Sequence, residues 1–303
     1  LKKEKNLALI ADEVKAIYEK IRVKVVEPLT VRRTRKDLWE NDAYRQDLES
    51  QHIHFPDVKS PHKIYYQLDS DLETLYDKTI KCLSDKKDGL TYNRYQAIKY
   101  LKPNKKSKYK KADMISVQLA GIMKTLLVKR IDSSFYAFKQ SLKRYYDANK
   151  VMLDMFANGT IYIAPNLKVN ELLSEGKEEE LIKLIEEARY TDPTIEICTP
   201  DDFEKGFEEG IRYDDAILKE LVSMWDAVNV DPKLDEFIKY LKETLFDKSI
   251  NDKGKLVIFS ESKETTQYLF DSLKKQGFGK ILTVQSDNRD AQMPVLKENF
   301  DAN

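Results

Sequence analysis

A run of polar side chains at residues 260–263 has the types and the position needed to hold an anion. It follows an apolar stretch at 256–259 and precedes a helical pattern, so it joins an expected strand to an expected helix. A helix N-terminus offers free backbone N–H groups and the positive end of the helix dipole. An ordinary strand-to-helix turn without a ligand fits the same residues. The residues of this turn are Ser260, Glu261, Ser262 and Lys263, with Ser262 as the expected N-cap.

The basic stretch at residues 86–111 is a second candidate. It carries ten basic side chains and one acidic one, a net charge of +9, and tyrosines lie between them. Lysines hold a phosphate backbone and aromatic rings stack on bases, so this composition favours nucleic-acid binding. A solvated loop around Pro103 and Asn104 is the alternative. Lys105 and Lys106 are the predicted nucleic-acid contacts of this stretch. Its tyrosines are Tyr92, Tyr95, Tyr100 and Tyr109.

Two further basic pairs complete the candidate nucleic-acid contacts. Arg32 and Arg33 lie in the run RRTRKDL, and Lys129 and Arg130 lie beside an apolar helical stripe. Contacts from such side chains to phosphates position a nucleic acid without reading its bases. For the RRTRKDL run, a helix hairpin with a basic solvent-facing side remains the alternative.

The sequence contains no self-contained catalytic constellation. It has no GxxxxGK[ST] phosphate loop, no acidic pair of the DEAH type and no GxSxG nucleophile motif. His52 and His54 would share one face of a strand, but a zinc site needs three or four ligands. We therefore expect no catalytic residue, no metal site and no cofactor on this chain.

Composition favours a helical protein. Charged residues make up 34% of the 303, and only nine glycines and nine prolines argue against a turn-rich all-β fold. No apolar run reaches the roughly 18 residues that a membrane span needs, so no membrane partner is expected. Cys82 and Cys198 lie far apart in sequence, which indicates a reducing, cytoplasmic setting without a disulfide framework.

The spacing of apolar residues predicts a helical middle region. At 115–146, Leu, Met and Phe recur on one stripe that should form core, and Ser133 with Ser134 allows close packing or a bend. The segments 256–259 and 281–284 enclose a helix and would form a βαβ unit with parallel strands. Further helices are expected at 7–21, after a cap at Asp69 or Ser70, at 172–188 and at 211–225. A further strand is expected at 63–68, and a short strand or extended segment at 161–165.

Negative charge gathers at residues 171–226, where eighteen acidic and six basic side chains give a net charge of −12. A solvated helix face is the plain interpretation. The same region could screen the basic stretch or dock a protein partner.

Several runs resemble those of Swi/Snf-type helicase-like ATPases of superfamily two, in a bacterial branch. DPKLD at 231–235, a helix and KLVIFSE at 255–261 resemble the entry to the second RecA-like lobe. VRRTRKDL at 31–38 is similar to the end of the first lobe. The runs at 54–76 and 126–138 also resemble family segments, and Arg289 and Phe300 follow at about the expected distance.

The resemblance implies a mainly α chain with a helical middle region and a partial α/β, RecA-like C-terminal part. Residues 1–50 would end the first lobe, 51–230 would be a helical insertion, and 231–303 would be the truncated start of the second lobe. The parent would be a translocase on double-stranded DNA that uses ATP and Mg²⁺. Its phosphate loop and arginine finger would lie outside this sequence, so the fragment alone would not hydrolyse ATP.

Two other functions fit the same residues. A non-enzymatic helical scaffold would dock protein partners through its acidic and basic faces. A regulatory relative of the ATPases would keep the architecture without the catalysis. The first is distinguished by an absence of DNA affinity.

Overall fold

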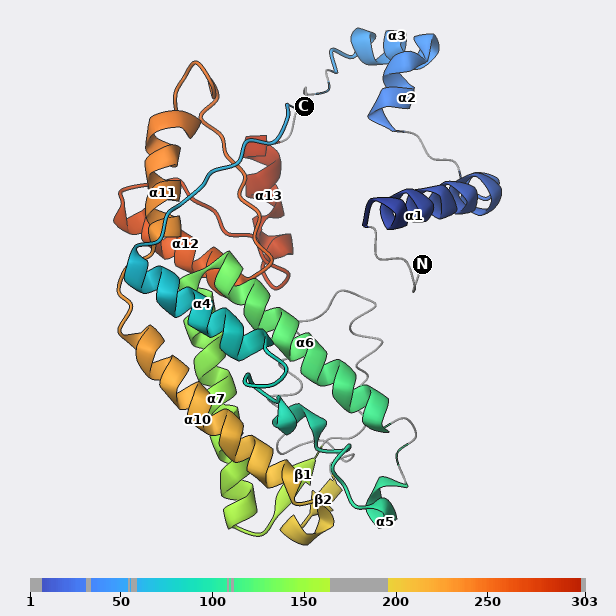
Figure 1. Cartoon of the computed structure of the whole chain (residues 1–303). Helices are drawn as coiled ribbons and strands as arrows, with labels where there is room; N and C mark the ends of the chain where they lie inside the picture. Colours follow the sequence, from blue (N-terminus) through green and yellow to red (C-terminus); the bar gives the residue numbers. More distant parts are fainter. Residues whose placement is uncertain are drawn as a thin grey trace. The chain divides into compact units, whose positions relative to one another are not determined.

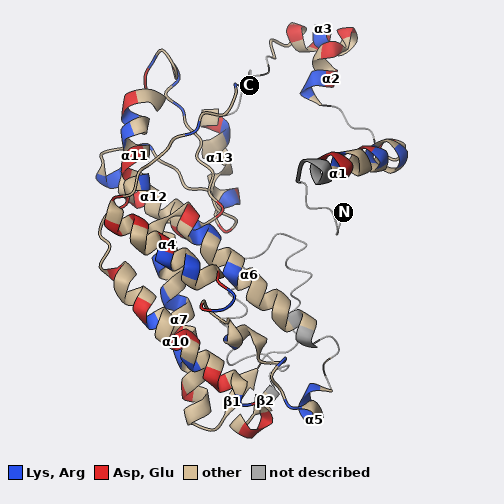
Figure 2. Ribbon diagram, in the orientation of Figure 1, with Lys and Arg blue, Asp and Glu red and all other residues tan. Residues whose placement is uncertain are grey.

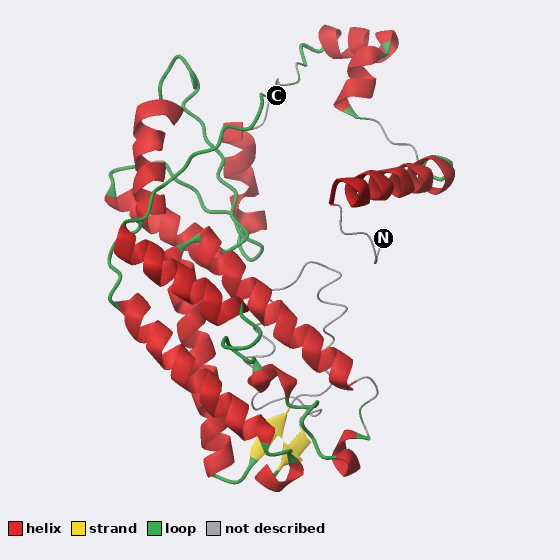
Figure 3. Cartoon of the chain, viewed as in Figure 1, coloured by secondary structure: helices red, strands yellow, loops and turns green. Residues whose placement is uncertain are grey.

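The computed structural model describes residues 7–30, 34–53, 55, 59–107, 109, 112–163 and 196–300. These residues are mainly helical, and the two strands among them have three residues each (Figures 1 and 3). The predicted mainly α character is confirmed, but no RecA-like α/β part occurs in the described ranges. Their helices include none that is long and apolar enough to cross a membrane. The chain divides into two compact units, Lys63–Arg289 and the remainder.

The unit outside Lys63–Arg289 contains helices whose apolar side chains stay exposed. Helix α1 spans Leu7–Ile21, the predicted bounds, and continues into a π-helical turn, η1, at Arg22–Val26. Tyr18 is 69% exposed and Leu29 is 80% exposed. The other helices are α2 (Arg35–Glu40), capped by Thr34, α3 (Asp42–Ser50), capped by Asn41, and α13 (Arg289–Phe300).

Four helices of the Lys63–Arg289 unit pack together, and we call them the helical body. Helix α7 packs against α6 and α10, and α4 also contacts both of these helices. Of the two predicted caps, Asp69 and Ser70, Asp69 caps α4 by accepting the backbone N–H of Leu72. The four helices are α4 (Ser70–Ser84), α6 (Ala112–Ser133), α7 (Phe135–Ala157) and α10 (Gly206–Asp226).

The main core lies between these helices. Trp225 of α10 is almost fully buried, with ring centroids 5.1 Å from Phe135 and 5.2 Å from Phe138. Burying side chains of this size contributes roughly 1.5–3 kcal/mol each. The stripe predicted to form core is buried here: Leu119, Met123, Leu126, Leu127, Phe135, Phe138 and Leu142.

The predicted bend at the two serines is a complete break between helices. Helix α6 ends at Ser133, and Ser134 has an extended backbone with φ of −162°. Its hydroxyl accepts the backbone N–H of Ala137 at 3.4 Å and caps α7. The chain reverses here, so α6 and α7 pack side by side.

A second core lies beside a small hairpin. After Gly159, whose φ is +73°, β1 (Ile161–Ile163) pairs antiparallel with β2 (Glu196–Cys198). The predicted strand is confirmed at these three residues. The predicted helix at 172–188 lies outside the described residues.

The basic stretch is packed onto the helical body through its tyrosines. Tyr92 is 4% exposed, stacks on Tyr145 at 5.8 Å and donates its hydroxyl to the carbonyl of Leu83 at 2.9 Å. Tyr95 is buried beside the same ring. Base stacking by these two tyrosines is therefore a wrong prediction, because their faces already form core. The stretch also contains η2 (Asn93–Gln96) and α5 (Pro103–Lys106).

The C-terminal part of this unit has its own small core, formed by Ile238, Leu241 and Leu273. Asp231 caps α11 (Pro232–Tyr240), which continues into η4 (Leu241–Leu245). Ser262 caps α12 (Lys263–Lys275) as predicted, and Gly277 with φ of +89° follows its end. We call residues 231–289 the C-terminal segment.

The strands predicted in this segment are absent. Neither 256–259 nor 281–284 forms a strand, and the predicted strand at 63–68 is also irregular. Leu256 and Ile281 pack against the small core, whereas Phe259 is 92% exposed. The apolar pattern gave a wrong prediction because a strand also needs a partner backbone, and among these residues Leu256 and Ile281 instead pack against the small core while Val257 and Ile258 stay exposed.

Candidate nucleic-acid interface

The turn at 260–263 is held by its own hydrogen bonds. The backbone N–H of Thr265 donates to the hydroxyl of Ser262 at 3.3 Å, and that of Ser262 donates to the hydroxyl of Ser260 at 3.2 Å. Ser262 is 3% exposed, so its hydroxyl faces the protein. The predicted helix start is therefore confirmed, but its capping hydroxyl is already engaged.

Two arginines of the helical body converge on one carboxylate in this helix start. Arg130 near the end of α6 donates to Glu264 at 3.0 Å, and Arg144 on α7 donates to its other oxygen at 2.9 Å. Arg130 also donates to the hydroxyl of Ser262. The reversal of the chain at Ser134 places the two arginines on adjacent helices. The structure thus brings Arg130 and Ser262, chosen separately from the sequence, into direct contact.

The surroundings of Glu264 favour the charged form of its carboxylate. Burial acts to raise its pKa, but the charges of Arg130 and Arg144 and hydrogen bonds, including one from Ser262, outweigh burial. The net effect is a pKa below the ordinary value. Glu264 and the two arginines therefore form a charged triad at neutral pH.

More polar contacts surround the triad. The hydroxyls of Ser133 and Thr265 share a hydrogen bond of 3.2 Å. Tyr136 stacks on Tyr268 with centroids 4.7 Å apart and an interplanar angle of 5°. The hydroxyl of Tyr268 donates to Asp231 at 3.1 Å. We call these contacts, together with the triad, the junction between the helical body and the C-terminal segment.

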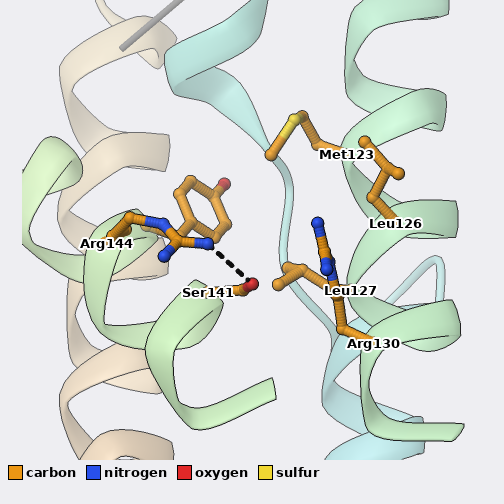
Figure 4. Close-up of a pocket in the computed structure, with 7 residues that line it drawn as sticks. Met123, Leu126, Leu127, Arg130, Ser141 and Arg144 are labelled. Carbon is orange, nitrogen blue, oxygen red and sulfur yellow. Dashed lines mark hydrogen bonds between the residues drawn. The ribbon is translucent and has the colours of Figure 1, made fainter. Parts of the chain in front are cut away.

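A small pocket lies beside the two arginines. In Figure 4 their side chains come from facing helices toward it, and Arg144 donates to Ser141 at 3.1 Å. The pocket volume of about 20 Å³ suits one water molecule and is far too small for a nucleotide. Any phosphate here would bind at the surface of the junction.

Two predicted lysines flank the junction and are half exposed. Lys129 lies 3.9 Å from the carboxylate of Glu261, which is 85% exposed. Lys263 lies 3.4 Å from Asp287. Exposed ion pairs of this kind contribute little to stability, so either lysine can exchange its partner at low cost.

The other predicted lysines belong to a different part of the unit, around α5. Lys105 pairs with Asp202 at 2.9 Å, and Lys106 donates to the carbonyl of Lys99 at 2.9 Å. Figure 2 shows α5 and α12 at opposite ends of the helical body. The structure therefore does not bring Lys105 and Lys106 together with the 260–263 turn.

Some lysines of the helical body donate hydrogen bonds to backbone carbonyls at helix C-termini. Lys124 donates to the carbonyl of Ser84 in the last turn of α4 at 2.5 Å, and Lys139 donates to the carbonyl of Val228 just after α10. A cation at a helix C-terminus offsets the helix dipole and pairs with an otherwise unbonded carbonyl. Charge counted along the sequence thus overstates the charge free to meet a ligand.

Several predicted features lie outside the described residues. They are Arg32 and Arg33, His54, and the part of the acidic region before residue 196. Among the described residues, no group of three or more His, Cys, Asp or Glu side chains is placed to hold a metal ion.

Sequence reasoning missed Glu264 and Arg144 as partners. Glu264 lies in the first turn of its helix, where an acidic residue is common, and Arg144 reads as one of several basic residues beside the core stripe. Neither signal indicates a pairing across 120 residues.

The chain matches no protein-family model, no curated protein and no solved structure. The resemblance to the helicase-like ATPases therefore remains a prediction from the sequence runs.

Proposed function

We propose that this chain is the central part of a nucleic-acid-dependent, helicase-like ATPase. In it, the chain supplies contacts to the phosphate backbone of double-stranded DNA and couples the two lobes mechanically. ATP and Mg²⁺ act in the parent protein, whose phosphate loop and arginine finger are not among these residues. The fragment itself performs no ATP hydrolysis, and the setting is cytoplasmic, in keeping with the two free cysteines.

The convergence of Arg130 and Arg144 on the start of α12 is the observation that carries this proposal. Guanidinium groups fit phosphate oxygens as they fit carboxylate oxygens, and Lys129 and Lys263 add charge nearby. Contacts of this type are independent of sequence, which a motor that steps along any DNA requires. The burial of Tyr92 and Tyr95 limits the proposal to phosphate contacts, without base stacking by these rings.

The junction also supports a coupling role. It joins the helical body to the C-terminal segment through ion pairs, hydroxyls and one stacked tyrosine pair. Polar contacts of this kind can be exchanged for others without exposing a large apolar core. Movement of the C-terminal segment could thus be transmitted to α6 and α7.

Fluorescence anisotropy with a labelled DNA duplex tests the proposal. The double variant Lys129→Ala with Lys263→Ala should bind more weakly, and the slope of log K against log[salt] should become shallower by about 2, one for each lost phosphate contact. The double variant Lys87→Ala with Lys219→Ala is the matched control, because it also removes two exposed positive charges, both away from the junction. A double variant that follows the parent chain throughout the salt series would refute the DNA contacts.

A helical scaffold that docks protein partners is the second candidate. The exposed apolar side chains of α1 and η1, including Tyr18 and Val25, favour it. A protein partner could also meet the acidic region 171–226. This candidate predicts no salt-dependent DNA affinity in the same titration.

A further inference from the structure

We propose that Glu264 occupies the place of a DNA phosphate between Arg130 and Arg144, and that phosphate binding releases α12 from the helical body. The inference rests on the proposed function and adds a regulatory contact to it. In the closed arrangement the chain covers its own strongest phosphate contacts. DNA opens them by exchanging one anion for another.

The geometry of the triad is that of an anion held between two guanidinium groups. Each oxygen of Glu264 accepts from a different arginine, at 3.0 and 2.9 Å. Ser262 donates its hydroxyl to the same carboxylate at 3.0 Å. A phosphate presents oxygens with the same charge and hydrogen-bonding character, so it can replace the carboxylate on the arginines.

The exposure of the three side chains suits such an exchange. Arg130 has 9% of its side chain exposed, whereas Arg144 has 39% and Glu264 has 28%. A DNA phosphate would therefore meet Arg144 first, at the surface. Arg130 becomes available only when Glu264 withdraws, and this links binding to movement of α12.

The rest of the junction allows the release. The core of the helical body and the small core around Leu273 share no buried residue. Between them lie the hydroxyl pair of Ser133 and Thr265 and the stacked rings of Tyr136 and Tyr268. Opening therefore breaks mainly polar contacts that water can replace, and each core stays intact.

The two lysines beside the triad, Lys129 and Lys263, also favour exchange of carboxylates for DNA phosphates. Lys129 and Lys263 pair with exposed carboxylates at 3.9 and 3.4 Å. DNA phosphates compete for these lysines as they compete for the arginines. A DNA backbone thus replaces several internal acid–base pairs at one place.

DNA binding by Glu264→Gln tests the competition. Glutamine keeps the size of the side chain and removes its charge. We expect this variant to bind a fluorescein-labelled duplex about three- to tenfold more tightly at low salt, with a salt slope steeper by about 1–2. Glu220→Gln is the matched control, because it removes one carboxylate from the exposed Lys78 pair on the helical body. Equal affinities for Glu264→Gln and the parent chain would overturn the proposal.

Hydrogen exchange of the unsubstituted chain tests the release without any variant. Amides of α12 should exchange faster when duplex DNA is bound, while those of α7 keep their protection. Unchanged or stronger protection of α12 in the DNA complex would overturn the inference and leave DNA binding intact. No DNA binding by the parent chain or by Glu264→Gln would instead refute the proposed function itself.

Discussion

The carboxylate of Asp214 on α10 accepts the backbone N–H of Thr91 at 2.7 Å, across 123 residues of sequence. It also accepts the backbone N–H of Asn93 at 3.2 Å. Between these residues, Tyr92 has a backbone φ of +55°, a value that residues other than glycine rarely adopt. The buried carboxylate thus holds a strained turn of the basic stretch against the helical body.

This arrangement predicts a dependence of stability on pH. Burial raises the pKa of Asp214 from 3.8 to about 6, despite the hydrogen bonds that favour its charged form. Between these two pH values the folded chain binds a proton that the unfolded chain does not bind. Protonation of Asp214 therefore contributes about 3 kcal/mol to the free energy of unfolding below pH 3.8. This contribution is lost as the pH rises through 6.

Urea unfolding of the parent chain and of Asp214→Asn, from about pH 5 to about pH 7.5, measures this effect. The difference in unfolding free energy between the two proteins should change with pH, because only the parent chain titrates at this position. Parallel curves for the two proteins would contradict the prediction.

Removal of the buried Thr79 hydroxyl should destabilise the helical body. The indole of Trp225 donates to this hydroxyl at 2.9 Å, and both side chains are buried. Thr79→Val leaves the indole N–H without its partner, which costs about 1–3 kcal/mol. Denaturant unfolding followed by tryptophan fluorescence measures the loss. Thr74→Val, at an exposed position of α4, is the control and should change stability much less.

Two glycine substitutions should differ in effect. A Cβ at Gly210 would lie 1.8 Å from the side-chain nitrogen of Asn93, which donates to the carbonyl of Gly206. Gly210→Ala should therefore displace Asn93 and destabilise the fold by about 1–3 kcal/mol. Nothing lies within 4 Å of a Cβ at Gly121 in α6, so Gly121→Ala should be neutral or stabilising by about 0.5–1 kcal/mol. Thermal unfolding of both variants decides the comparison.

The stacked tyrosines of the junction should be energetically coupled. A double-mutant cycle compares the parent chain with Tyr136→Ala, Tyr268→Ala and the variant that carries both substitutions. We expect a coupling free energy of about 0.5–1.5 kcal/mol, as is typical of aromatic pairs. A control cycle with Tyr136 and Tyr213, which lies in the first half of α10, should give a coupling free energy near zero. Additive effects for the stacked pair would show that the stacking contributes nothing to the junction.

Much of the helical structure could be predicted from the sequence because its signals are local. Ser262 and one of Asp69 and Ser70 were expected at helix starts, and Ser262 and Asp69 each accept the backbone N–H of the third residue of their helix. The apolar stripe of α6 and α7 indicated the core because residues three and four apart share one helix face. These features need only a few neighbouring residues to form.

Tertiary structure decided the rest. The residues at 256–259 have side chains typical of strands. A strand also requires a second backbone at hydrogen-bonding distance, and the local sequence does not determine whether such a partner is present. Tyr92 and Tyr95 have the composition of a stacking surface, and the position of Tyr145 on α7 makes them core. Arg130, Arg144 and Glu264 meet only because the chain reverses at Ser134 and returns through α10 and α11. Local hydrogen bonds and periodicity determined the helices, whereas the charged site depends on long-range packing that no short segment encodes.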